Sequence, residues 1–160
     1  MRKLIVWAAA GVVALCGVVA AVEVFGAYRV PAGPFAGGAA CSRALAGLPE
    51  RLLGRERDAV EGTGAAGWGD GAIVLRCGVR PLAPTIDSCV NVNGVDWVLD
   101  DERAQRSGEW VFTTYGRETA VAVAFKGGQV AGDALVVING SLGHLAQKSR
   151  CPGADDAAIG

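Results

Sequence analysis

Two carboxylates and two guanidinium groups are the side chains of this sequence best suited to chemistry. Asp70 and Asp96 could act as the general acid and the general base of a hydrolase. Such an enzyme would hold both carboxyl groups in one cleft, roughly 5 to 10 Å apart, as glycosidases do. Arg76 and Arg117 could pair with these carboxylates as structural ion pairs, or they could point into a ligand groove. The sequence leaves both interpretations of the arginines open.

Other residues that often serve catalysis or binding are better explained as structural. His144 is the only histidine, and on a predicted helix it suits a surface or boundary position better than the role of a base. Residues 100–102 are acidic but lack the further spaced oxygen ligands of a calcium site, so a solvated turn is expected. Trp68, Trp97 and Trp110 are expected to anchor the core or pair across strands, in preference to stacking on a sugar.

No known catalytic motif is found in the sequence: it has no nucleophile elbow, phosphate loop, metal-spaced histidines or dinucleotide fingerprint. Neither a cofactor nor a metal site is predicted. Residues 29–160 carry 13 basic and 15 acidic side chains without a basic cluster. Such a balanced surface argues against a nucleic-acid partner and against a strong anionic-lipid footprint, so no electrostatic partner is implied.

The first residues indicate a membrane anchor. Two basic residues precede residues 4–22, which carry no charge and would span about 28 Å as a helix. That length is close to the hydrocarbon thickness of a bilayer. We expect residues 1–28 to form a signal anchor with a cytoplasmic N-terminus, and the remainder of the chain to be extracytoplasmic.

Two alternatives to a retained anchor remain. A cleaved signal peptide usually has a shorter apolar core, roughly 7 to 15 residues. Its best cleavage pattern here, at residues 19–21, lies inside the apolar run. Lipidation of Cys16 is the weaker alternative, because the bulky Leu15 precedes it where a small residue is needed.

Four cysteines follow the apolar run: Cys41, Cys77, Cys89 and Cys151. In an oxidising compartment an even number indicates disulfides, and four cysteines allow three connectivities. A zinc site is the weaker alternative, because zinc ligands usually come in close pairs and no C-x-x-C pair is present.

Composition divides the chain further. Proline and glycine predict a linker over residues 29–40, and five glycines around Trp68 predict a loop over residues 61–71. Residues 41–151 would form the folded domain, and residues 152–160 a flexible tail.

Hydrophobic periodicity predicts the first elements of this domain. Residues 41–54 have apolar residues at helical spacing, with Pro49 breaking or kinking the helix and Gly54 ending it. Residues 72–79 alternate as a strand does. The side chains predicted on one face of that strand are Ile73, Leu75, Cys77 and Val79.

Two hairpins are predicted next. Residues 89–99 contain Asn93-Gly94, which suits a type I′ turn. Residues 109–125 would turn at Gly116-Arg117. The implied cross-strand pairs are Val92 with Val95 and Val90 with Trp97 in the first hairpin, and Phe112 with Val121 and Trp110 with Val123 in the second.

The last element is predicted to be a helix capped by Asp133, although residues 135–138 could instead form a strand. Its inward side chains would be Leu135, Ile138, Leu142 and Leu145. The order of elements predicts an α+β fold: an antiparallel sheet built from two hairpins plus one strand, with an N-terminal and a C-terminal helix packed on one face.

Several short motifs resemble a known family. They are Cys41-x-x-x-Leu45-x-x-Leu48-Pro49, Trp68-Gly69-Asp70 before residues 73–79, the stretch 92–97, and Phe112-Thr113-Thr114-x-Gly116-Arg117. In this order, over about residues 41–125, they look like the actinobacterial membrane-anchored family called domain of unknown function 3515. The resemblance implies a membrane segment and an extracytoplasmic domain in the envelope of a high-GC Gram-positive bacterium. It implies no activity.

Cys41 and Cys77 both belong to these motifs and lie on predicted inward faces. A disulfide between them is therefore expected, which leaves Cys89 to pair with Cys151.

We thus expect a binding or scaffolding module of the cell envelope, with a paired-carboxylate hydrolase as the alternative. Residues 4–22 would contact the membrane, and the partner would be an envelope protein or ligand. The predicted binding residues, which are polar or aromatic and lie in or beside the family-like motifs, are Trp68, Asp70, Arg76, Asp96 and Arg117.

Overall fold

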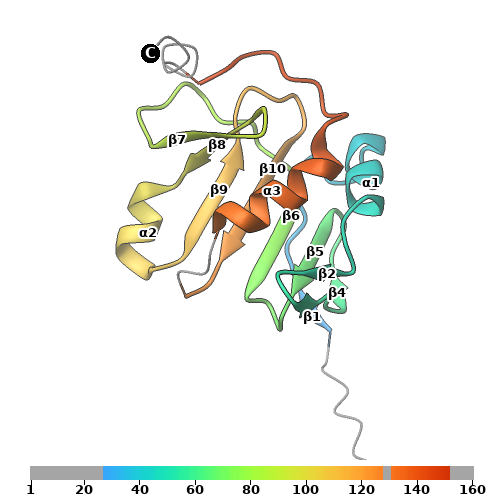
Figure 1. Ribbon diagram of the computed structural model, residues 1–160. Helices are drawn as coiled ribbons and strands as arrows, with labels where there is room; N and C mark the ends of the chain where they lie inside the picture. Colours follow the sequence, from blue (N-terminus) through green and yellow to red (C-terminus); the bar gives the residue numbers. More distant parts are fainter. Residues whose placement is uncertain (1–26, 128–130, 152–160) are drawn as a thin grey trace, which may run out of the picture.

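The computed structural model describes residues 27–127 and 131–151 (Figure 1). Its helices are α1 (Ala39–Ala46), α2 (Asp101–Ser107) and α3 (Ala131–Leu142). Its strands are β1 (Tyr28–Arg29), β2 (Arg51–Leu52), β3 (Arg55–Glu56), β4 (Val60–Glu61), β5 (Ala65–Trp68), β6 (Ile73–Val79), β7 (Cys89–Val92), β8 (Val95–Leu99), β9 (Trp110–Thr114) and β10 (Ala120–Phe125).

The predicted membrane segment and C-terminal tail, residues 4–22 and 152–160, lie outside the described residues. Within residues 27–127 and 131–151, no helix has the length and apolar character needed to cross a bilayer.

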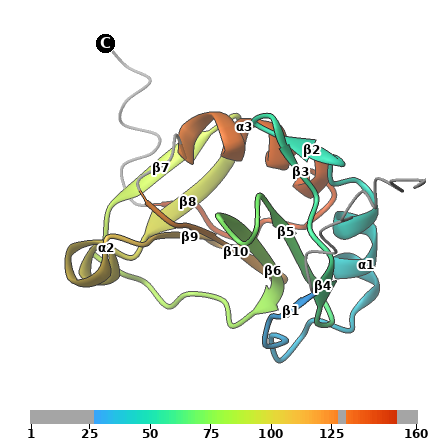
Figure 2. The same cartoon turned by 90° about the horizontal axis from the view of Figure 1, so that it is seen from below.

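The fold is α+β, as predicted. Six strands form an antiparallel sheet in the order β5-β6-β10-β9-β8-β7. Helices α1 and α3 contribute to the core on one face of this sheet, and the chain between β6 and β7 crosses below the other face (Figure 2). Two small two-stranded sheets flank it: β1 pairs with β4 in parallel, and β2 pairs with β3.

The core lies between the sheet and the two helices. On β10, Val121, Val123 and Phe125 are fully buried. The four side chains predicted to point inward from the last helix are all buried. Leu135, Ile138 and Leu142 lie on α3, and Leu145 lies in the turn that follows it. Large apolar side chains therefore fill one face of the sheet, and their burial is the main stabilising contribution.

The first hairpin has the predicted register. Val92 pairs with Val95 and Val90 with Trp97. Asn93 and Gly94 have φ values of 47° and 83°, both positive as a type I′ turn requires.

The predicted register of the second hairpin is wrong by two residues. Phe112 pairs with Val123, not Val121, and Trp110 pairs with Phe125. The pairing of β9 with β10 ends at Thr113 and Ala122, and the next N–H on β10, that of Val121, donates to the Thr114 hydroxyl at 3.0 Å. A shift of two residues keeps each side chain on its predicted face, because strands have a period of two.

The predicted helix over residues 41–54 is also too long. Helix α1 ends at Ala46, and the chain after Pro49 forms the β2–β3 hairpin. The turn of this hairpin uses Leu53 and Gly54, both with positive φ. Gly54 therefore closes a hairpin and does not end a helix.

The predicted loop over residues 61–71 contains β5, which pairs with β6 along its whole length. A Cβ added to Gly67 would overlap the Tyr28 hydroxyl. This glycine therefore allows another segment to approach the strand closely, so glycine content here reflects packing and not a loose chain.

The predicted linker also differs from the structure. Residues 28–38, here named the N-terminal strap, lie on the sheet: Val30 and Ala36 are buried, and the Phe35 N–H donates to the Gly78 carbonyl at 2.9 Å. Glycine at position 78 admits this contact, because an added Cβ would overlap the backbone of the strap.

Helix α2 was not predicted. Residues 100–102, expected as a solvated turn, begin it: the Asp100 carboxylate accepts a hydrogen bond from the Arg103 N–H at 2.8 Å. Gly108 ends it with φ 68°. Asp133 lies in the first turn of α3, which already begins at Ala131.

Both predicted disulfides are confirmed. Cys41 pairs with Cys77 at a Cα–Cα distance of 5.5 Å, and Cys89 pairs with Cys151 at 6.4 Å. The first disulfide joins α1 to β6, and the second joins β7 to the segment after α3.

Two glycine substitutions test the close packing of the strap. Gly54 and Gly78 have φ values of 77° and 75°, but an added Cβ meets nothing within 4 Å at Gly54. Gly54→Ala should lower the free energy of unfolding by about 1–2 kcal/mol, the cost of a left-handed residue. Gly78→Ala should lower it by a further ~1–3 kcal/mol, because the strap must move. Equal losses in urea denaturation would contradict the packing.

Candidate functional site

The face of the sheet opposite α1 and α3 carries small side chains. Ala122 lies between Arg76 and Thr113 on the neighbouring strands, and Ala124 lies between Val74 and Val111. All of these side chains are partly exposed. Strand β10 is thus lined by alanine at the centre of the sheet, where the exposed face is hollow.

Two segments border this hollow. The N-terminal strap lies on one side, where the Arg76 Nε donates to the Pro31 carbonyl at 3.1 Å. Arg103 of α2 and Glu109 before β9 lie on the other side, and α2 is itself held to the chain before β7 where the Ser88 N–H donates to the Asp101 carboxylate at 2.9 Å. That hydrogen bond lowers the pKa of Asp101.

The resulting cavity has a volume of about 240 Å³ and is here named the alanine groove. Its lining residues are Tyr28, Arg29, Val30, Pro31, Val74, Arg76, Arg103, Glu109, Val111, Ala122, Ala124 and Lys126.

The alanine groove has a positive rim. It has four cationic side chains but only one carboxylate, Glu109, which accepts a hydrogen bond from the Arg103 Nε at 2.9 Å. Arg29 pairs with Glu61 at 3.2 Å. Across the described chain, neither Arg76 nor Lys126 has a carboxylate within ion-pair distance. These two cations are available to an anionic ligand.

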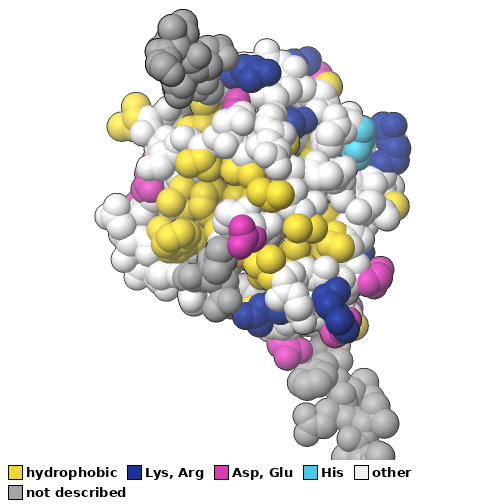
Figure 3. Space-filling model, viewed as in Figure 1, with side chains coloured by type: hydrophobic (Ala, Val, Ile, Leu, Met, Phe, Trp, Pro, Cys, Tyr) yellow, Lys and Arg dark blue, Asp and Glu magenta, His cyan; other side chains and the backbone are white. Residues whose placement is uncertain are grey.

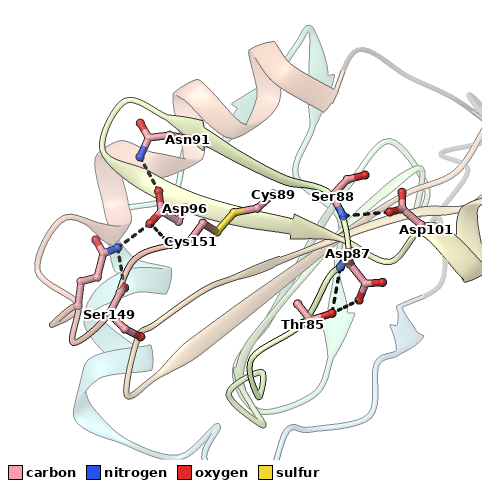
Figure 4. Close-up of a disulfide and its surroundings, with 10 residues drawn as sticks. Thr85, Asp87, Ser88, Cys89, Asn91, Asp96, Asp101, Ser149 and Cys151 are labelled. Carbon is pink, nitrogen blue, oxygen red and sulfur yellow. Dashed lines mark hydrogen bonds between the residues drawn. A yellow bond between two sulfur atoms is a disulfide. The ribbon is translucent and has the colours of Figure 1, made fainter. Parts of the chain in front are cut away.

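Asp96 has a different environment. Its carboxylate is fully buried and accepts hydrogen bonds from the Asn91 side chain at 2.6 Å, the Gln147 side chain at 3.1 Å and the Cys151 N–H at 3.1 Å (Figure 4). The disulfide from Cys89 to Cys151 lies beside it. Asp96 therefore binds the segment after α3 to the first hairpin.

Arg117 serves the same segment. It is 6% exposed, and its Nη1 donates to the Leu145 carbonyl. Burial lowers the pKa of the guanidinium, and the charge of Asp96 opposes that shift. Its Nε has no hydrogen-bond partner among the described residues. In the described chain Arg117 and Asp96 form neither a hydrogen bond nor an ion pair. The two charges attract each other only over a longer distance.

Trp68 is a core residue. It is fully buried, its Nε1 donates to the Pro49 carbonyl at 3.0 Å, and the Arg57 guanidinium lies 5.9 Å from the ring centre. Trp97 is also fully buried and donates to Asn139 on α3. Trp110 differs, because it is 39% exposed.

Asp70 is exposed on the turn between β5 and β6, in a left-handed conformation with φ 58°. Its N–H donates to the carboxylate of Asp58, a residue that the sequence analysis did not single out. Asp58 also accepts from the Tyr28 hydroxyl at 2.9 Å and the Gly71 N–H at 2.8 Å. Burial, that hydrogen bond and the charges of Asp58 and Asp70 raise the pKa of Tyr28 well above its ordinary value.

A second hollow of about 390 Å³ lies here, lined by Tyr28, Glu56, Arg57, Asp58, Ala59, Gly69 and Asp70. The Asp58 carboxylate uses both oxygens for hydrogen bonds within the protein. Asp58 therefore serves to fix the strap and the turn.

The structure does not bring the two proposed catalytic carboxylates together. Asp70 lies on the turn before β6 and Asp96 on β8, with β10 and β9 between those strands. Asp96 is buried and Asp70 is exposed. His144 is exposed, as expected, with its Nε2 3.1 Å from the Ala40 carbonyl. In the part of the chain that is described, no group of three acidic, histidine or cysteine side chains could hold a metal.

Of the five predicted binding residues, only Arg76 therefore lies in the alanine groove. Arg29, Arg103 and Lys126 were not predicted as binding residues, and the strap, α2 and the end of β10 bring them to the groove. One signal was present: along β10, alanine alternates with larger residues.

The helix side of the molecule exposes a separate apolar surface. Figure 3 shows hydrophobic side chains gathered over this side. The most exposed large ones on α3, β7 and β9 are Val136, Val137, Val90 and Trp110, at 39–45% exposure. This surface lies on the opposite face of the sheet from the alanine groove.

Comparison with known families gives one match: the family described as "Protein of unknown function (DUF3515)" matches residues 4–149. The chain belongs to the DUF3515 family. The match covers more than the motifs quoted above, because it extends through α3 to the segment held by Asp96. Neither the curated proteins nor the solved structures contain a match to this DUF3515 chain.

The buried carboxylate gives a first prediction for this region. Asp96→Ala should lower the free energy of unfolding by about 3–5 kcal/mol, because it leaves three donors without their acceptor and removes the negative charge that attracts the buried Arg117 guanidinium. Glu118→Ala is the control, since it removes an exposed pair with Lys148 and should change stability by less than about 1 kcal/mol. Urea denaturation measures both. An Asp96→Ala loss no larger than the control would contradict the structural role.

Tyr28 gives a second prediction, from its raised pKa. The unfolded phenol ionises near pH 10, while the folded one keeps its proton to higher pH. The unfolded state therefore binds fewer protons above about pH 10, and stability should fall as pH rises through this range. Tyr28→Phe should remove this fall and the last step of the tyrosinate absorbance titration. Tyr115→Phe should keep both, and loss of both in that variant would contradict the assignment.

Proposed function

We propose that this DUF3515 chain is a binding module of the cell envelope, attached to the outer face of the membrane by residues 4–22. The apolar run, the two disulfides and the balanced surface charge support this proposal. The binding surface in this proposal is the alanine groove.

One observation carries the proposal. Strand β10 contributes only small side chains, Ala122 and Ala124, to the alanine groove, and cations surround them. Larger apolar residues there would close the hollow and bury more surface. The opposite face already supplies the core, so this hollow is not required for folding.

The side chains of the alanine groove suit binding better than catalysis. Its carboxylate, Glu109, is engaged by Arg103. The hydroxyl group of Tyr28 donates a hydrogen bond to the Asp58 carboxylate. Neither group is placed to take a proton from a ligand, whereas Arg76 and Lys126 can attract negative charge.

Filling the alanine groove tests the function. Ala122→Leu would place a larger side chain on its floor and should abolish photocrosslinks formed in the native envelope from a photoreactive residue at position 113, which pairs with Ala122 from β9. The melting temperature should change little, because the added methyl groups enter open space. Ala46→Leu, at an exposed position on α1, is the matched control and should leave the crosslinks intact.

Groove crosslinks that persist with unchanged yield in Ala122→Leu would refute the alanine groove as the binding surface. So would equal loss in Ala46→Leu.

A further inference from the structure

We propose that the alanine groove holds the phosphate headgroup of an anionic lipid, at the surface of the membrane to which the chain is attached. This inference rests on the proposed function and names the ligand of the same site.

The position of the groove supports a lipid. Its wall includes Tyr28 to Pro31, which come shortly after the apolar run at residues 4–22. The five residues between them span at most about 18 Å when fully extended. The headgroup layer itself adds roughly 5–8 Å on each side of the hydrocarbon. The groove is therefore tethered within reach of the headgroups.

The arrangement of the charges suits a phosphate. Arg76 faces Ala122, and Lys126 directly follows the last residue of β10. At about 3.3 Å per residue, Ala122 and Lys126 are roughly 13 Å apart along the strand. Cations thus flank the alanine floor at both ends. Arg76 uses its Nε for the Pro31 carbonyl, which leaves its terminal nitrogens for the paired hydrogen bonds that arginine makes to phosphate.

Lys126 lies at the end of the groove next to Tyr28, which follows the apolar run closely in sequence. A Cβ built on Gly71 would lie 3.5 Å from the Tyr28 ring and 3.7 Å from the Lys126 Nζ, so these two side chains share one location. Tyr28 begins the strap, so Lys126 stands where the chain enters the domain from the apolar run. A headgroup entering from the membrane would meet Lys126 first and Arg76 deeper in the groove.

The size of the groove limits what it can hold. Its volume of about 240 Å³ is below the range of roughly 300–1,000 Å³ typical for drug-sized ligands. A phosphate with its glycerol is small enough, and the floor of Ala122, Ala124 and Val111 offers apolar contact to the glycerol carbons. Acyl chains would stay in the bilayer.

The test uses the full chain in vesicles. The protein is reconstituted into phosphatidylcholine vesicles doped with a headgroup-photoreactive analogue of either phosphatidylglycerol or phosphatidylcholine, and labelled peptides are mapped. We expect more labelling by the phosphatidylglycerol analogue, on β6, β10 and the strap. Arg76→Gln and Lys126→Gln should each reduce it by about fivefold, the effect of one basic residue near an anionic surface. Ala122→Leu should abolish it.

Arg43→Gln is the matched control, because Arg43 is an exposed arginine on α1, across the sheet from the groove. It should keep the wild-type labelling. Equal labelling by both lipid analogues would overturn the inference, and so would an equal loss in Arg43→Gln, which would indicate diffuse surface charge. Saturable binding of inorganic phosphate to the detergent-solubilised chain, without headgroup preference in vesicles, would assign the groove to a soluble anion and also overturn it.

Failure of the lipid inference differs from failure of the proposed function. If the groove binds another ligand, Ala122→Leu still abolishes the envelope crosslinks from position 113, while the lipid labelling shows no headgroup preference. If the groove binds nothing, Ala122→Leu changes neither the envelope crosslinks from position 113 nor the lipid labelling.

Discussion

The alternation of large and small side chains on β10 is the constraint on which the rest of the structure depends. Val121, Val123 and Phe125 form the centre of the core on one face, and Ala122 and Ala124 lie on the other. Because side chains alternate along a strand, β10 directs these three large residues into the core and two small ones to the opposite face, which is left hollow. The core and the alanine groove are two consequences of one pattern.

The second face is nevertheless closed at its sides, and glycine makes this possible. Gly67 and Gly78 let the N-terminal strap lie directly on β5 and β6, where any side chain would overlap it. The strap supplies one wall of the groove and is also the part of the domain nearest the apolar run. Any ligand held there would consequently contact the strap as well as the sheet.

Local patterns predicted much of the fold. Asn93-Gly94 gave the first hairpin its register, and the helical spacing of the leucines gave α3 its inner face. Predictions failed where distant segments decide the structure. The glycines of residues 61–71 are typical of a loop, yet they accommodate Tyr28 from the strap.

The candidate site was harder to predict for the same reason. Residue type and motif indicated Asp96 and Arg117 as binding residues. Both are buried and make hydrogen bonds to the segment after α3, so neither is available to a ligand. Arg103 and Lys126 lie in no motif, and they reach the groove only because α2 and β10 end beside it. A charged side chain marks a binding surface when the fold leaves it without a partner. Within the alanine groove that condition selects Arg76 and Lys126, the two cations without a carboxylate partner among the described residues, and both can therefore attract an anionic ligand.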